Sequence, residues 1–135
     1  MIRSAAMSEP GYRLLLVRVF VRDFERAVRF YNDTLGMKLS SRSDDMGWAQ
    51  FTLGGADLAL ERDRGEDEDD GDDESLVGRF VGVSLAVDDI DQTYERLLAR
   101  GVEFLRPPQK MPWGGVLAHF RDPDGNVLTL VGNAR

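Results

Sequence analysis

Few side chains in this sequence are chemically reactive, and their scarcity narrows the chemistry that the chain can perform. The chain has no cysteine, which excludes disulfide bonds, thiolate zinc sites and a cysteine nucleophile. His119 is the only histidine. It could serve as a general base if an orienting partner and a substrate proton lay within hydrogen-bond distance. A single imidazole can equally contact a ligand or support the structure, so both interpretations of His119 stay open.

The acidic residues are concentrated in one segment. Eight of them lie between Glu66 and Glu74, and without them the net charge of −7 becomes +1. We expect a solvated linker there, because residues 62–75 include no apolar side chain that could pack. A lid that attracts a cationic ligand and a weak calcium site are the alternatives, although the spacing lacks the EF-hand pattern. The chain shows no basic stripe, so nucleic acid is not an expected partner.

The elements that would position reactive residues occur twice in the sequence. Val21-Arg22-Asp23-Phe24 and Val87-Asp88-Asp89-Ile90 each end an apolar strand and begin a helix. An aspartate at such a position can cap the helix by accepting from free backbone N–H groups of the first turn. Gly36 and Gly101 are placed to end the two helices. The repetition predicts two copies of one β-α-β-β-β unit, with the functional site between them.

The fold class that follows is α+β, with two tandem modules forming a curved mixed-sheet cleft. The first helix is expected to run from Phe24 to Leu35, because its apolar residues recur at helical spacing. Alternation and turn signals predict strands at 12–21, 37–40, 48–53, 56–61, 80–87, 102–105, 116–120 and 127–131. The expected organisation is a flexible tail at 1–11 and one domain at 12–132, made of module one (12–62), the acidic linker (63–78) and module two (79–132).

Composition places the chain among ordinary globular proteins. Hydrophobic residues make up 42% of the sequence. No apolar run approaches the ~20 residues of a membrane span, and the first ten residues lack the apolar segment of a signal peptide. We therefore expect a cytoplasmic protein with no membrane partner.

Several of these motifs resemble those of a known superfamily. Val-x-Asp before a helix with Phe30-Tyr31, followed by Leu35-Gly36-Met37, resembles the first half of a vicinal oxygen chelate domain. Pro112-Trp113-Gly114-Gly115 and the run from Phe120 to Asn126 resemble the second half. This superfamily includes glyoxalase I, extradiol dioxygenases, fosfomycin-modifying enzymes and bleomycin-resistance proteins. Because its fold carries unrelated chemistries, the resemblance implies the architecture more strongly than any one activity.

The resemblance also implies where a metal would be bound. Metal-dependent members place His, Gln or Glu on four inner strands, and the corresponding positions here are Leu16, Ala59, Gly82 and Thr129. Three of these residues offer no side-chain donor, and a lone threonine hydroxyl is a poor ligand for a transition metal. We therefore expect that the metal has been lost and that no other cofactor is required. Glyoxalase I and extradiol dioxygenase activities are not expected, since each depends on that metal.

The residues around these positions would line the ligand cleft by the same resemblance. Phe20 stands where glyoxalase I has its glutathione-binding arginine, which argues against a glutathione substrate. The expected ligand contacts are an apolar and aromatic wall with one cation, one imidazole and one hydroxyl, provided by Leu16, Arg18, Phe20, Trp48, Trp113, Leu117, His119 and Thr129. Such a wall suits planar organic ligands, because aromatic rings stack on one another.

Two functions of different classes follow from this set of residues. The first is a metal-free, bleomycin-resistance-like protein that sequesters a hydrophobic or aromatic compound, such as an antibiotic or metabolite, without changing it. The second is a metal-independent lyase, isomerase or oxidoreductase that uses His119 and Arg18 on a small organic substrate. The resemblance also implies a homodimer, whose clefts form either within one chain or between two chains.

Overall fold

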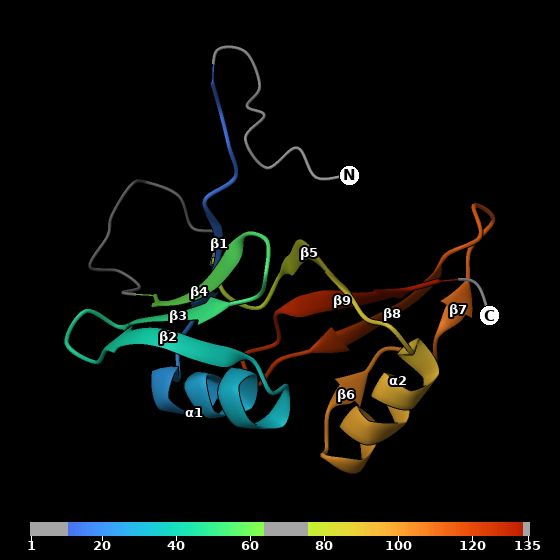
Figure 1. Ribbon diagram of the computed structural model, residues 1–135. Helices are drawn as coiled ribbons and strands as arrows, with labels where there is room; N and C mark the ends of the chain where they lie inside the picture. Colours follow the sequence, from blue (N-terminus) through green and yellow to red (C-terminus); the bar gives the residue numbers. More distant parts are fainter. Residues whose placement is uncertain (1–10, 64–75, 134–135) are drawn as a thin grey trace.

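The chain folds into two mixed β-sheets, each with one helical segment across one face. The computed structural model describes residues 11–63 and 76–133. Figure 1 shows the two sheets side by side, with α1 beneath the first sheet and α2 beneath the second. The elements are β1 (Leu16–Val21), α1 (Phe24–Arg29), η1 (Phe30–Thr34), β2 (Lys38–Ser43), β3 (Trp48–Thr52), β4 (Asp57–Arg62), β5 (Phe80–Ala86), α2 (Ile90–Ala99), β6 (Glu103–Phe104), β7 (Gln109–Lys110), β8 (Val116–Arg121) and β9 (Val127–Gly132).

The two sheets have corresponding strand orders, which confirms the predicted repeat and the α+β fold class. The first sheet has the order β1-β4-β3-β2, and the second has the order β5-β9-β8-β6. In both, the strand before the helix pairs in parallel with the last strand of its module. The predicted aspartate caps are confirmed. The Asp23 side chain accepts from the Arg26 backbone N–H, and that of Asp89 accepts from the N–H of Gln92.

Several elements differ from the prediction by one or more residues; β2, for example, ends at Ser43 instead of Ser40. Three further differences have a clear local cause. The first strand begins at Leu16 instead of Tyr12, because Leu16 pairs with Asp57, the first residue of β4, and no partner strand extends further. The first helix changes to a π-helix at Phe30, where the Leu35 N–H donates to the Phe30 carbonyl. β7, a two-residue strand that pairs with β8, was not predicted because it lies in a proline-rich loop and is too short for alternation to be visible. The acidic residues Glu66–Glu74 lie outside the described residues.

The helix-facing sides of both sheets form one continuous core. Val19, Phe51 and Leu58 of the first module belong to the same cluster as Phe120 and Leu128 of the second, and all five are fully buried. The rings of Phe30 and Phe120 lie 6.5 Å apart between centroids and join the first helix to the second sheet. The two modules are therefore packed as one hydrophobic unit.

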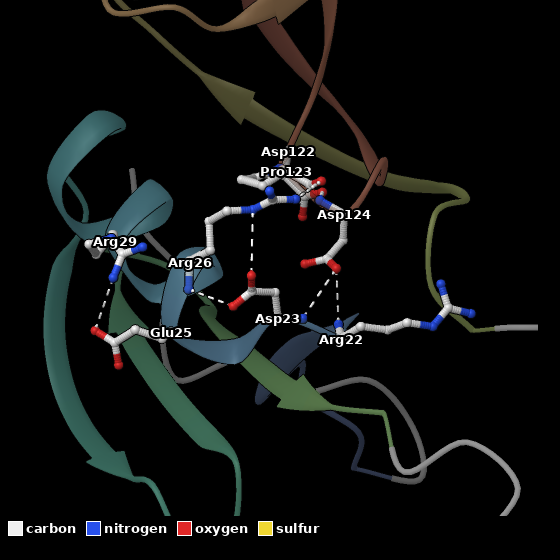
Figure 2. Close-up of polar contacts among 8 residues, drawn as sticks. All are labelled: Arg22, Asp23, Glu25, Arg26, Arg29, Asp122, Pro123 and Asp124. Carbon is white, nitrogen blue, oxygen red and sulfur yellow. Dashed lines mark hydrogen bonds and ion pairs between the residues drawn. The ribbon is translucent and has the colours of Figure 1, made fainter.

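A polar junction fixes the two modules at one end of β1. The turn after β8 provides the acceptors: Asp124 Oδ1 lies 3.1 Å from the backbone N of Arg22 and 3.3 Å from that of Asp23 (Figure 2). Arg26 donates to the Pro123 carbonyl at 2.7 Å across the same junction. The backbone N–H groups of Arg22 and Asp23, just before α1, thus donate to a side chain of the other module.

Beneath this surface lies a buried network that uses the same turn. The Tyr31 hydroxyl donates to Asp122 Oδ2 at 2.7 Å. Asn126, which is fully buried, donates to the Phe20 carbonyl at 2.9 Å and accepts from the Gly78 N–H at 2.7 Å. Burial raises the pKa of Asp122, although hydrogen bonds from Asn126 and Tyr31 oppose the shift. Burial, together with the neighbouring Asp122 charge, also raises the pKa of Tyr31.

Candidate functional site

The open face of the first sheet carries a row of polar side chains beside one small residue. Ala59 of β4 pairs with Arg18 on one side and with Gln50 on the other. Arg18 donates to Glu61 Oε1 at 3.0 Å, and its guanidinium lies 5.4 Å from the centre of the Phe20 ring. The carboxylate and the aromatic face together hold this cation against the sheet.

A second chain of hydrogen bonds crosses the same face. Trp48 Nε1 donates to Gln50 Oε1 at 3.2 Å, and Gln50 Nε2 donates to Asp57 Oδ2 at 2.8 Å. Gln50 therefore fixes both the indole and the carboxylate in place. Gln50 and Asp57 were not among the predicted contacts. Successive side chains of a strand point to opposite faces, so Gln50 lies on the same face as Trp48, and Asp57 lies on the same face as Ala59.

The open face of the second sheet holds the only imidazole. His119 and Thr129 are paired residues on β8 and β9, and His119 Nδ1 lies 2.8 Å from Thr129 Oγ1. The Phe80 ring packs edge-on against the imidazole, with 5.7 Å between the ring centres. His119 Nε2 makes no hydrogen bond to the residues that the structure describes. The ring is thus held at one nitrogen and open at the other.

The four positions at which the superfamily places metal ligands do not fit a metal in this chain. Ala59 is fully buried, and the Thr129 hydroxyl is bonded to His119. Gly82 has a φ of +71°, a left-handed conformation that a histidine or glutamate rarely adopts. Across the described ranges 11–63 and 76–133, no group of three or more His, Cys, Asp or Glu residues could hold a metal ion.

A cavity of about 620 Å³ lies between the two modules. Its walls come from β1, the turn between β3 and β4, the segment after the first helix, β5 and α2. Val81 and Val83 from the helix-facing side of β5 line it together with Gly82 and Ser84 from the open side, so it extends around the edge of that strand. A volume of this order is typical of sites for drug-sized molecules.

The predicted contacts are divided among four places. Arg18 lines the cavity, whereas Leu16, Phe20 and Trp48 occupy the first module outside its lining. The second module holds Leu117, His119 and Thr129, also outside the lining. Trp113 is 65% exposed on the loop between β7 and β8, where its ring lies against Gly115. The structure therefore does not bring His119 and Arg18 together in this cavity.

Most cavity residues were not identified from the sequence. Apolar residues of β5 and α2, such as Val83 and Leu97, have the periodicity of ordinary core positions. Thr93 and Arg96, three residues apart on α2, both line the cavity. Their spacing was a usable signal, since residues at i and i+3 share one helix face. What the sequence could not show is that this helix face borders a cavity.

The comparisons with known proteins agree with this architecture. A profile of the glyoxalase/bleomycin resistance protein/dioxygenase superfamily matches residues 13–130. The chain belongs to this superfamily. A member from Nocardioides, described as a glyoxalase/bleomycin resistance protein/dioxygenase, has a crystal structure that superposes with a TM-score of 0.73 at 33% identity, covering 92% of this chain and 85% of that one.

Relatives in the superfamily have different names. The uncharacterized protein YraH of Bacillus subtilis is 34% identical over 87% of this chain and 96% of its own. A probable lactoylglutathione lyase of Synechocystis is 32% identical over 87% of this chain and 93% of its own. Superfamily membership is therefore shared with proteins of more than one description. None of the described helices is long and apolar enough to cross a membrane.

Proposed function

We propose that this superfamily member is a metal-free protein that binds and sequesters a small hydrophobic or aromatic compound, an antibiotic or a metabolite. The cavity between the modules carries the proposal, because its walls are predominantly aliphatic and its volume of about 620 Å³ suits a drug-sized ligand. Burial of apolar ligand surface would supply most of the binding free energy.

The residues at the former ligand positions support binding without metal-dependent chemistry. Leu16, Ala59 and Gly82 have no donor atom, and the Thr129 hydroxyl has a partner in His119. Restoring a metal at Gly82 would need a new backbone conformation as well as a new side chain, because its φ is +71°. This argues against the lyase activity named for the Synechocystis relative.

The test is a ligand panel measured by thermal shift and calorimetry, followed by recovery of the compound and mass spectrometry. We expect aromatic and aliphatic compounds to raise the melting temperature and to be recovered unchanged. Val83→Trp, which fills the cavity, should abolish binding, whereas Leu98→Trp on α2, outside the cavity lining, should not. Absence of any binding, or binding that Val83→Trp leaves intact, would contradict the proposal.

A second candidate function is supported by one observation. His119 is fixed through Nδ1 by Thr129, while no described residue bonds to Nε2, which is how an oriented general base is held. This alternative is a metal-independent lyase, isomerase or oxidoreductase acting on a small organic substrate with His119 as the base. Arg18, the other residue expected to take part, lines the cavity apart from His119, so the substrate would have to reach from the cavity to the open face of the second sheet. Turnover of any panel compound that His119→Gln abolishes would favour the enzyme over the binding protein.

We also propose a homodimer as the assembled form. Tyr12, Leu14 and Leu15 precede β1 and are 68–72% exposed, and Phe80 on the neighbouring module is 61% exposed. Such a group of exposed large apolar side chains is typical of an interaction surface. Light scattering after gel filtration should give twice the mass of 15.1 kDa, and Leu14→Lys combined with Phe80→Lys should give the monomer.

A further inference from the structure

We propose that the ligand of the cavity between the modules is an amphipathic monoanion, a carboxylic acid whose carboxylate is bound by Arg96 and Thr93. This inference rests on the proposed binding function and adds that the bound ligand is negatively charged. Three ionisable side chains line the cavity: Arg18, Asp57 and Arg96. Arg18 is paired with Glu61 at 3.0 Å, so Arg96 is the cation of the lining that has no acidic partner among the described residues, and a single carboxylate would pair with it.

The charged side chains at the two ends of the cavity differ in whether they have partners within the protein. At the β1 and β4 wall, Arg18 is bonded to Glu61 at 3.0 Å, and Asp57 accepts from Gln50 at 2.8 Å. At the α2 wall, the Arg96 guanidinium makes no ion pair or hydrogen bond with any described residue. Among the described residues of the lining, the α2 wall is therefore the one that offers an unpaired cation to a ligand.

Arg96 has a second donor beside it on the same wall. Thr93 lies one turn earlier on α2 and lines the cavity, although it is only 9% exposed. A guanidinium and a hydroxyl both donate hydrogen bonds, and a carboxylate accepts more than one. Arg96 is exposed to solvent, so it can stay hydrated beside a neutral ligand, but only an anionic ligand would gain a charge-assisted hydrogen bond from it.

The rest of the cavity suits the apolar body of such an acid. Val17, Leu35 and Met37 form one side and Val81, Val83 and Leu85 the other. Methionine adapts to ligands of different outline because its side chain is unbranched and flexible. The arrangement therefore selects for an anionic head and an aromatic or aliphatic body, without fixing the shape of the body.

Arg96 has an ordinary structural role as well, which the experiment must separate from ligand binding. It lies in the last turn of α2, where a cation stabilises the helix through its dipole. Replacing it can lower stability without any effect on a ligand. The decisive quantity is therefore the affinity ratio between an acid and its matched alcohol, which a purely structural role would not change.

The experiment compares naphthoic acid with naphthalenemethanol, and decanoic acid with decanol, by calorimetry on the full chain. We expect each acid to bind about 10-fold more tightly than its alcohol, since one charge-assisted hydrogen bond is of that order. Arg96→Gln should remove this preference, so that the acid-to-alcohol affinity ratio falls to about one, and Arg96→Lys should retain part of it. Arg106→Gln removes the same charge outside the cavity lining and should have no effect.

The outcomes separate this inference from the proposed function. If the alcohols bind as tightly as the acids, or if Arg96→Gln leaves the ratio unchanged, the monoanion inference is wrong and the binding function stands. If neither acids nor alcohols bind, both proposals fail. Folding of each variant is checked by its melting temperature, and Arg96→Lys provides the folded control if Arg96→Gln is unstable.

Discussion

β1 and β5 are equivalent strands of the two modules, yet only β1 is paired along its whole length. Six consecutive residues of β1, from Leu16 to Val21, pair with β4. β5 pairs with β9 at Phe80 and again from Ser84 to Ala86, with an irregularity between. Gly82 lies at this interruption in a left-handed conformation. Both strands line the cavity, β1 through Val17 and Arg18 and β5 through every residue from Val81 to Ala86. The more irregularly paired strand therefore provides the larger part of the lining.

The end of β1 is held beside the start of β5 by Asn126, which bonds to the Phe20 carbonyl and to the Gly78 N–H. Asn126→Ala should lower the free energy of unfolding by about 3 kcal/mol, because it leaves the Phe20 carbonyl and the Gly78 N–H without their partner. Urea denaturation measures the loss.

Arg26→Ala is the matched control at the same junction. It removes the bond to the Pro123 carbonyl, but the Arg26 side chain is 53% exposed, so the expected loss is below about 1 kcal/mol. Equal losses for the two variants would show that the buried network does not hold the modules together.

The interruption in β5 can be tested at Gly82 itself. Gly82→Ala should cost about 1–2 kcal/mol, because an L-residue is strained at a φ of +71° even though a Cβ there would meet no atom closer than 3.9 Å. Gly55→Ala is the control, since a Cβ there has open space and its φ is not left-handed. If Gly82→Ala lowers the free energy of unfolding no more than Gly55→Ala does, the irregular pairing of β5 does not depend on a glycine at this position.

The junction also predicts a dependence on pH. The pKa of Asp122 is raised in the folded protein by burial, so the folded state binds its proton more tightly than the unfolded state does. The contribution of this group is fully present below the unfolded pKa and is lost as pH rises through the folded pKa. The stability of the wild type relative to Asp122→Asn should therefore increase as pH is lowered from neutral towards the ordinary aspartate range. Urea titrations of both proteins at several pH values measure this difference, and a relative stability that falls on acidification would contradict it.

The smallest expected effect concerns Arg18, the cation on the β1 side. Glu61→Gln weakens an ion pair whose side chains are 53% and 32% exposed, so the unfolding free energy should change by less than about 1 kcal/mol. The released cation should tighten binding of a carboxylic acid a few-fold while leaving its alcohol unaffected. Unchanged acid affinity would indicate that Arg18 does not interact with the ligand from its side of the cavity.

The sequence was sufficient for the features that rest on local patterns. The two Val-x-Asp motifs predicted both helix starts, and the caps formed by Asp23 and Asp89 are present as expected. Strand alternation is present in β1, where Val19 and Val21 are buried on the face opposite Arg18. Helix capping and strand alternation depend on neighbours within a few residues, so they can be recognised without the tertiary fold.

The cavity could not be predicted in the same way. It depends on a gap between two modules and on a strand that exposes both faces, and neither property leaves a periodic signal. Arg96 has no distinguishing signal in the sequence, because the absence of a side-chain partner among the described residues follows from the positions of side chains on other elements. The eight residues predicted to contact the ligand remain predictions, and only Arg18 among them lines the cavity.

The carboxylate that Asp124 presents to the backbone of Arg22 and Asp23 makes the first module incomplete by itself. The backbone just before a helix is usually satisfied by residues next to it in sequence, but here the acceptor comes from about a hundred residues away in the other copy. If the first module were separated from the second, these N–H groups would have to bond to water or to another molecule. A repeat that looks like two independent units in the sequence is therefore not divisible into two independent domains.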